Sequence, residues 1–224
     1  MRSSGACGRR SRSGARSPTS KDRGPIRYLA LGDSYTICTG ASTPSYSWPA
    51  IVAKRLTEQT GRKVEVTNPA VNGFTTLDLI AKELPLVNRL KPDLVTILIG
   101  VNDLVRGRST GEYRTSLVNV YDEVASLHLP KGRVMAISIP NWSVVPAARA
   151  YGDPERIRDL TDMFNGIARE ESDSRGFKWI DISSASVAGL GLAGWISSDD
   201  LHPGDTQYAA WAEAIWLDVR TVWK

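Results

Sequence analysis

The sequence predicts an α/β protein in which helices cover both faces of a parallel, doubly wound sheet. From residue 26 onward, five short β-rich apolar runs alternate with helical patterns. Two of these runs are nearly continuous in apolar residues, which is typical of strands that are buried on both faces. The length of 224 residues also suits one domain with a buried core.

The elements can be placed by their apolar runs, periodicity and capping residues. Ser109 and Glu112 have the spacing of a capping box, and Asp153 is a good N-cap before Pro154. The last helix carries an apolar stripe at three- and four-residue steps. The expected strands are 26–32, 63–70, 93–100, 133–140 and 177–183, and the expected helices are 48–59, 75–90, 112–127, 154–174 and 206–222.

The basic charge of the chain is concentrated at its N-terminus. Residues 1–23 have seven Lys or Arg against one Asp, a net charge of +6, which leaves −2 of the total +4 for the remainder. Because residues 1–25 also lack a large apolar residue after Met1, we expect a disordered tail there and a folded domain over 26–224. Because the folded part has a net charge of −2, we expect no nucleic-acid partner.

Several features bear on the compartment. No run approaches the roughly 18–20 apolar residues of a membrane helix, and no apolar segment follows Arg9 and Arg10 as an export signal requires. The two cysteines, Cys7 and Cys38, do not form a disulfide framework. We therefore expect a cytoplasmic protein without membrane insertion, although the basic tail leaves export open.

Polar residues follow the predicted strands where parallel strands place their carboxyl ends. That edge is where such sheets bind ligands. Each motif is weak alone, whereas four in this order are specific. They are Gly32-Asp33-Ser34, Asn72-Gly73, Gly100 with Asn102 and Asp103, and Asp199 three residues before His202.

This set suits nucleophilic catalysis by a serine. A serine hydroxyl needs an adjacent base, and since His128 lies near the end of a predicted helix, His202 is the candidate base for Ser34. Asp199 has the spacing to orient the imidazole, while its rival Asp200 is interpreted as solvated. The expected oxyanion donors are the N–H groups of Ser34 and Gly73 and the carboxamide of Asn102.

Other residues near these motifs have simpler interpretations. We expect Asp33 and Asp103 to be structural and Cys38 to be a buried filler. The loops 142–148 and 187–195, with Trp142 and Trp195, either line an acyl-chain groove or pack under long loops.

Taken together, the motifs resemble the conserved blocks of the SGNH (GDSL) hydrolases over about residues 26–222. Within that family, the likeness is greatest to bacterial lysophospholipase-like acylhydrolases, with GDSYT in place of GDSL. The resemblance implies a flavodoxin-like three-layer α/β/α fold with a five-stranded parallel sheet, and esterase or lipase chemistry without a cofactor. The family's catalytic positions fall on Ser34, Gly73, Asn102, Asp199 and His202.

The predicted activity is hydrolysis of a small acyl ester through an acyl-serine intermediate. A carbohydrate O-deacetylase would use the same machinery with a polar pocket. A phosphate- or nucleotide-binding module is disfavoured because the first loop lacks the G-x-G-x-x-G pattern, and a non-catalytic binding role is disfavoured by the intact motif set. No Cys/His cluster has metal-ligand spacing, so no metal is expected.

Overall fold

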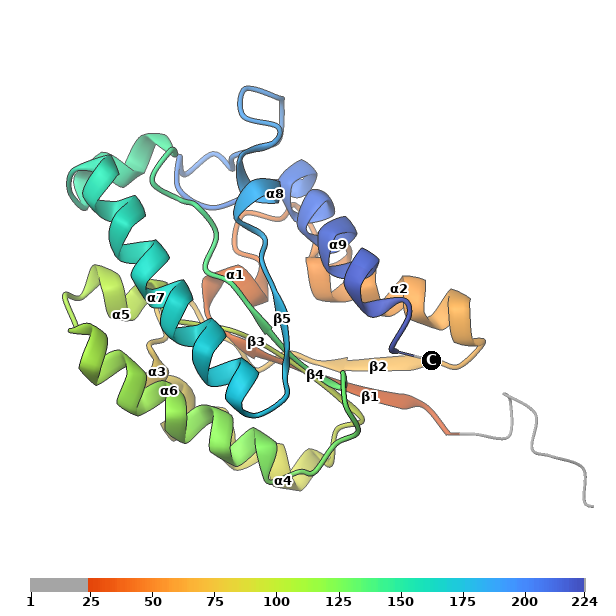
Figure 1. The fold of residues 1–224 in the computed structure, drawn as a ribbon. Helices are drawn as coiled ribbons and strands as arrows, with labels where there is room; N and C mark the ends of the chain where they lie inside the picture. Colours follow the sequence, from red (N-terminus) through yellow and green to blue (C-terminus); the bar gives the residue numbers. More distant parts are fainter. Residues whose placement is uncertain (1–23, 224) are drawn as a thin grey trace, which may run out of the picture.

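A computed structural model describes residues 24–223, and within this range five parallel strands form one sheet in the order β2–β1–β3–β4–β5 (Figure 1). The expected tail, residues 1–25, lies outside the described residues except for its last two. The chain passes from β1 to β2 on one side and returns to β3 on the other, which creates a switch point beside β1. The strands are β1 (Ile26–Gly32), β2 (Val64–Thr67), β3 (Leu94–Leu98), β4 (Val134–Ile137) and β5 (Lys178–Ile180).

Helices cover both faces of this sheet, so the molecule has three layers (Figure 1). α2 and α9 pack together on one face, whereas α3, α4, α6 and α7 cover the other. The predicted α/β/α fold is confirmed. The helices are α1 (Ser34–Ile37), α2 (Trp48–Thr60), α3 (Thr76–Lys82), α4 (Leu84–Leu90), α5 (Val101–Val105), α6 (Thr110–Ala125), α7 (Pro154–Ser174), α8 (Ser183–Val187) and α9 (Asp205–Val219), with 3₁₀ turns η2 (Pro44–Tyr46) and η3 (Pro146–Ala150).

The burial of the strands follows their sequence pattern. Every residue of β3 and β4 is buried, as their continuous apolar runs predict. The edge strand β2 is largely exposed and shorter than expected. None of the helices in residues 24–223 has the length and apolar content needed to span a membrane.

Helix starts agree with the predicted caps. Ser109 and Glu112 form the capping box that begins α6, and the Asp153 side chain accepts two backbone hydrogen bonds at the start of α7. The apolar periodicity does not predict α5 and α8, which are one turn or slightly longer.

The prediction of one continuous helix over residues 75–90 is wrong. The segment 75–90 forms two helices, α3 and α4, that meet at Glu83. Pro85 has no N–H to continue the hydrogen-bond ladder of α3, so the ladder breaks there. The break leaves the Glu83 side chain fully buried.

Candidate active site

Ser34 is the first residue of α1, directly after the turn that ends β1. Gly32 has φ of +155°, and a Cβ there would lie 2.2 Å from the Leu98 carbonyl oxygen, so only glycine fits. The buried Asp33 side chain accepts the Tyr35 N–H at 3.0 Å and caps α1. The structural role predicted for Asp33 is therefore confirmed, and this cap fixes the backbone around Ser34.

His202 and Asp199 form a bonded pair in the loop before α9. Nδ1 of His202 lies 2.6 Å from Oδ2 of Asp199. The other carboxylate oxygen accepts hydrogen bonds from the Ser197 hydroxyl at 2.6 Å and from the N–H groups of Leu201 and His202, each at 2.9 Å. These contacts hold Nδ1 as the donor, so Nε2 is the ring nitrogen that can accept a proton.

The charge of Asp199 is well stabilised. Partial burial raises its pKa, but hydrogen bonds from Ser197 and from the His202 side chain and backbone outweigh burial and hold the pKa well below its usual range. The Asp199 side chain is a carboxylate at neutral pH. The neighbouring Asp200 has φ of +59° and belongs to the turn, so Asp199 is the acid bonded to His202.

The structure brings Ser34 and His202 to the same edge of the sheet. The ring of Tyr35, the residue after Ser34, packs edge-on against the His202 ring with centroids 6.1 Å apart. No sequence signal identified Tyr35 as a neighbour of His202, because this contact joins residues 167 positions apart in the chain.

The loop after α1 is also fastened to the start of α9. Ser42 donates its N–H and its hydroxyl to the Asp205 carboxylate at 2.8 and 2.6 Å. The Tyr208 hydroxyl donates to the Thr39 carbonyl at 2.7 Å. These bonds hold the segment that follows Ser34 against the segment that follows His202.

The expected oxyanion donors border the same edge. Asn102, in α5, donates from Nδ2 to the Phe74 carbonyl at 3.0 Å and lies 3.4 Å from Asp33 Oδ2. Gly73 has φ of +79°, and its carbonyl accepts a 2.7 Å hydrogen bond from Arg106. Arg106 is four residues after Asn102, and this helical spacing was the signal that could have identified it.

Asp103 has the structural role that the sequence predicts. It is fully buried and accepts the Thr76 N–H at 2.8 Å and the Thr76 hydroxyl at 2.6 Å. Arg108 adds an ion pair at 2.6 Å. These contacts join the start of α3 to α5 and hold Asn102 in place beside them.

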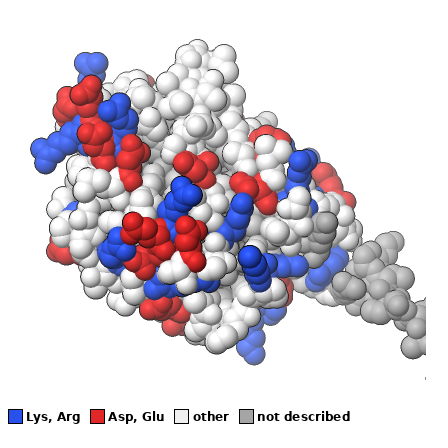
Figure 2. Space-filling model, viewed as in Figure 1, with Lys and Arg blue, Asp and Glu red and all other residues white. Residues whose placement is uncertain are grey.

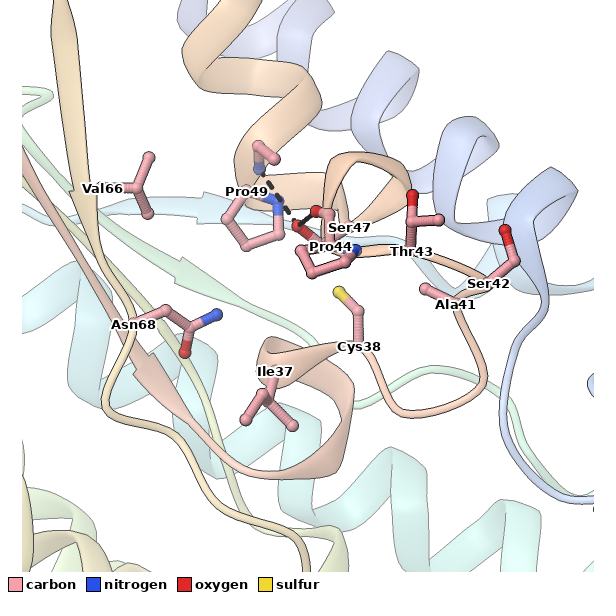
Figure 3. A pocket seen from close by; sticks show the side chains of 11 residues that line it. Ile37, Cys38, Ala41, Ser42, Thr43, Pro44, Ser47, Pro49, Val66 and Asn68 are labelled. Atoms are coloured by element: carbon pink, nitrogen blue, oxygen red, sulfur yellow. Dashed lines mark hydrogen bonds between the residues drawn. The ribbon is translucent and has the colours of Figure 1, made fainter.

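A cavity of about 430 Å³ lies between α1, β2 and the start of α2 (Figure 3). Cys38 lines it, at a left-handed position with φ of +63° that favours glycine. Burial raises the pKa of the Cys38 thiol far above its usual value, so the thiol stays protonated. These features support the interpretation of Cys38 as a filler.

A second cavity, of about 380 Å³, adjoins α5. Apolar side chains of α5, α7 and the loop after β4 make up most of its wall, and Trp142 is among them. By contrast, Trp195 is buried and donates its indole N–H to the Ser186 carbonyl at 3.2 Å, which supports a packing role. The lining side chains include Leu104, Val105, Trp142, Tyr151, Ile157 and Leu160.

Acidic and basic side chains are intermixed on the face of the molecule in Figure 2. Opposite charges are also paired where α7 ends, since Arg175 contacts Asp122 of α6 at 2.7 Å and Glu171 of α7 at 2.9 Å. The loop that projects at the top of Figure 2, after α8, shows no charged side chain in this view.

Residues 30–210 match the sequence model of the GDSL-like lipase/acylhydrolase family. The chain belongs to this family. Its curated relatives are named as esterases, and the chain is a carboxylic ester hydrolase. The family resemblance that the motifs predict is confirmed.

Individual relatives match different shares of this chain. Esterase TesA of Pseudomonas aeruginosa is 25% identical over 189 residues, which are 84% of this chain and 85% of that protein. An arylesterase of Vibrio mimicus is 38% identical over 82 residues, 36% of this chain and 40% of that protein. The crystal structure of an acetylxylan esterase from Geobacillus stearothermophilus superposes with a TM-score of 0.69 at 22% identity, covering 89% of this chain and 97% of that one, which supports the common fold.

Proposed function

We propose that this family member hydrolyses small acyl esters with Ser34 as the nucleophile, His202 as the general base and Asp199 as the orienting acid. The observation that carries the proposal is the 2.6 Å contact between His202 Nδ1 and Asp199 Oδ2, at the sheet edge where Ser34 begins α1. That contact directs the proton-accepting nitrogen away from Asp199.

The reaction proceeds in two steps. Ser34 Oγ attacks the ester carbonyl carbon while His202 Nε2 takes the hydroxyl proton, and the carbonyl oxygen becomes an oxyanion. The tetrahedral intermediate expels the alcohol, which receives that proton, and leaves an acyl-serine. A water molecule then attacks the acyl carbon, His202 takes its proton, and the carboxylic acid leaves as Ser34 regains its hydrogen.

The oxyanion is held by the N–H groups of Ser34 and Gly73 and by Asn102. Asn102 Nδ2 donates to Asp33 Oδ2 at 3.4 Å, a long hydrogen bond that a developing oxyanion at this edge would replace. One such donor contributes about 3–4 kcal/mol to transition-state stabilisation. We expect Asn102→Ala to lower kcat by about 10²–10³-fold.

The substrate is an ester with an apolar acyl or aryl group that occupies the cavity beside α5. The volume of about 380 Å³ is within the usual range for small-molecule sites. Leu104 and Val105, which line this cavity, belong to the same short helix as Asn102, and this relation to the proposed oxyanion site is the reason for choosing it. A carbohydrate O-deacetylase is the second candidate, since the acetylxylan esterase has the same fold.

Hydrolysis of p-nitrophenyl esters of rising acyl length, of acetyl-xylan and of lysophospholipid tests the proposal. We expect turnover of the p-nitrophenyl esters, labelling of Ser34 by a serine-directed phosphonate, and loss of both in Ser34→Ala. His202→Ala should lose turnover while it retains its fold. A preference for acetyl-xylan would favour the deacetylase, and full turnover by Ser34→Ala would refute the assigned nucleophile.

A further inference from the structure

Glu83 is a buried acid that no step of the proposed reaction uses. Its side chain, at the break between α3 and α4, is 0% exposed. Oε2 accepts the Gly32 N–H at 3.0 Å, whereas Oε1 has no hydrogen-bond partner among the described residues. Because Gly32 immediately precedes Asp33 and Ser34, Glu83 holds the backbone at the point where the nucleophile turn begins.

The surroundings favour the uncharged form of Glu83. A buried carboxylate with one unpartnered oxygen is much more costly than a neutral carboxylic acid. Burial raises the pKa of Glu83 to about 8, the Gly32 hydrogen bond opposes this increase, and the charge of Asp33 adds to it. Glu83 therefore carries a proton at neutral pH.

Asp33 is the second member of a buried carboxyl pair. Burial, with a smaller contribution from the charge of Asp103, raises its pKa to about 7 against hydrogen bonds from Tyr35 and Asn102. Asp33 has more donors than Glu83, so it ionises first and Glu83 second. Above the second ionisation, the pair has two negative charges in a low-dielectric interior.

Other titratable and charged groups on the elements packed around Glu83 have partners of their own or are exposed. Asp103 is paired with Arg108, the Tyr113 hydroxyl donates to the Ile99 carbonyl, and Glu123 accepts from Asn88. Lys82 and Arg89, on α3 and α4 themselves, are exposed.

We propose that Glu83 is a positioning residue that holds the nucleophile turn as a neutral acid and disturbs that turn when it ionises. The inference rests on the proposed role of Ser34. A charged Glu83 repels the Asp33 carboxylate, which caps α1 through the Tyr35 N–H at 3.0 Å. The repulsion acts on the two residues that flank Ser34, so alkaline pH lowers the rate of attack.

The test compares Glu83→Gln and Glu83→Ala with the wild type. Glutamine keeps an acceptor for the Gly32 N–H but does not ionise, whereas alanine removes the acceptor. We expect kcat of the wild type to fall at least about threefold between about pH 7 and about pH 9, and that of Glu83→Gln to stay level over this range. At neutral pH, Glu83→Gln should stay within about threefold of the wild type and Glu83→Ala should be lower by tenfold or more. The proposal is overturned if kcat of Glu83→Gln falls at alkaline pH as it does in the wild type. It is also overturned if Glu83→Ala has the wild-type kcat at neutral pH.

A stability measurement is independent of catalysis. A carboxyl whose folded pKa is raised from 4.5 to about 8 binds more protons when folded, so the unfolding free energy falls as pH rises through that interval. Wild-type stability that is flat there overturns the proposal even if Glu83→Gln does not fold. Asp33, with its pKa raised to about 7, contributes to the same fall, so the part of the fall that Glu83→Gln loses reports the protonation of Glu83. An enzyme that is active in Ser34→Ala refutes the proposed function instead and leaves this comparison of stability intact.

Discussion

Replacing Asp199 by asparagine separates the two tasks of this side chain. Oδ1 of Asp199 accepts from Ser197, Leu201 and the His202 backbone, and the carbonyl oxygen of asparagine can accept the same three bonds. Oδ2 accepts from His202 Nδ1 at 2.6 Å, and an amide NH₂ in its place donates instead. The imidazole must then present an unprotonated Nδ1, which moves its proton to Nε2 and removes the proposed base for Ser34.

The expected loss of kcat for Asp199→Asn is about 10⁴-fold, or about 5.5 kcal/mol of activation free energy. Because three of the four hydrogen bonds to Asp199 remain and the side chain is 44% exposed, the loss of unfolding free energy should be only about 1 kcal/mol. The assay is steady-state hydrolysis of a p-nitrophenyl ester, with chemical unfolding of the same samples.

Asp200→Asn is the matched control. Asparagine tolerates the left-handed backbone of Asp200, at φ of +59°, and the substitution removes the same charge from the adjacent position. We expect its kcat to stay within about twofold of the wild type. Equal losses in the two variants, or a loss below tenfold in Asp199→Asn, would refute the assignment of the orienting acid.

Three further substitutions test the packing around the site by chemical unfolding. Gly32→Ala places a Cβ 2.2 Å from the Leu98 carbonyl oxygen, so we expect a loss above about 3 kcal/mol or no folded protein. Gly166→Ala, within α7 and with nothing within 4 Å of the new Cβ, should instead raise the unfolding free energy by about 0.5–1 kcal/mol. Arg108→Met leaves the buried Asp103 without its ion-pair partner and should cost about 3 kcal/mol, and a loss below about 1 kcal/mol would contradict that role.

Much of the fold could be predicted because its signals are local. The apolar runs that form β3 and β4, the capping box at Ser109 and the Asp153 cap each lie within a few consecutive residues. The motifs that follow the strands could also be placed at one edge, because parallel strands end on the same side of a sheet.

The remaining features depend on contacts between distant segments. Glu83 ends α3 but bonds to Gly32, 51 positions earlier, and nothing in its neighbourhood of the chain indicates a buried acid. Arg106 bonds to the Gly73 carbonyl from 33 positions away. Pro85 and the four-residue step from Asn102 to Arg106 are local signals. Local periodicity does not contain the pairings themselves, so the bond from Gly32 to Glu83 and the support of the Gly73 turn became evident only in the folded structure.

The hydrogen bonds that join Ser42 and Thr39 to α9 have a consequence for biosynthesis. A ribosome makes the serine segment early, but α9, the helix that anchors this segment, begins only at Asp205. A growing chain therefore cannot assemble the proposed catalytic centre until α9 has been made. Stalled nascent chains that lack α9 should fail to react with a serine-directed phosphonate, and released full-length chains should react.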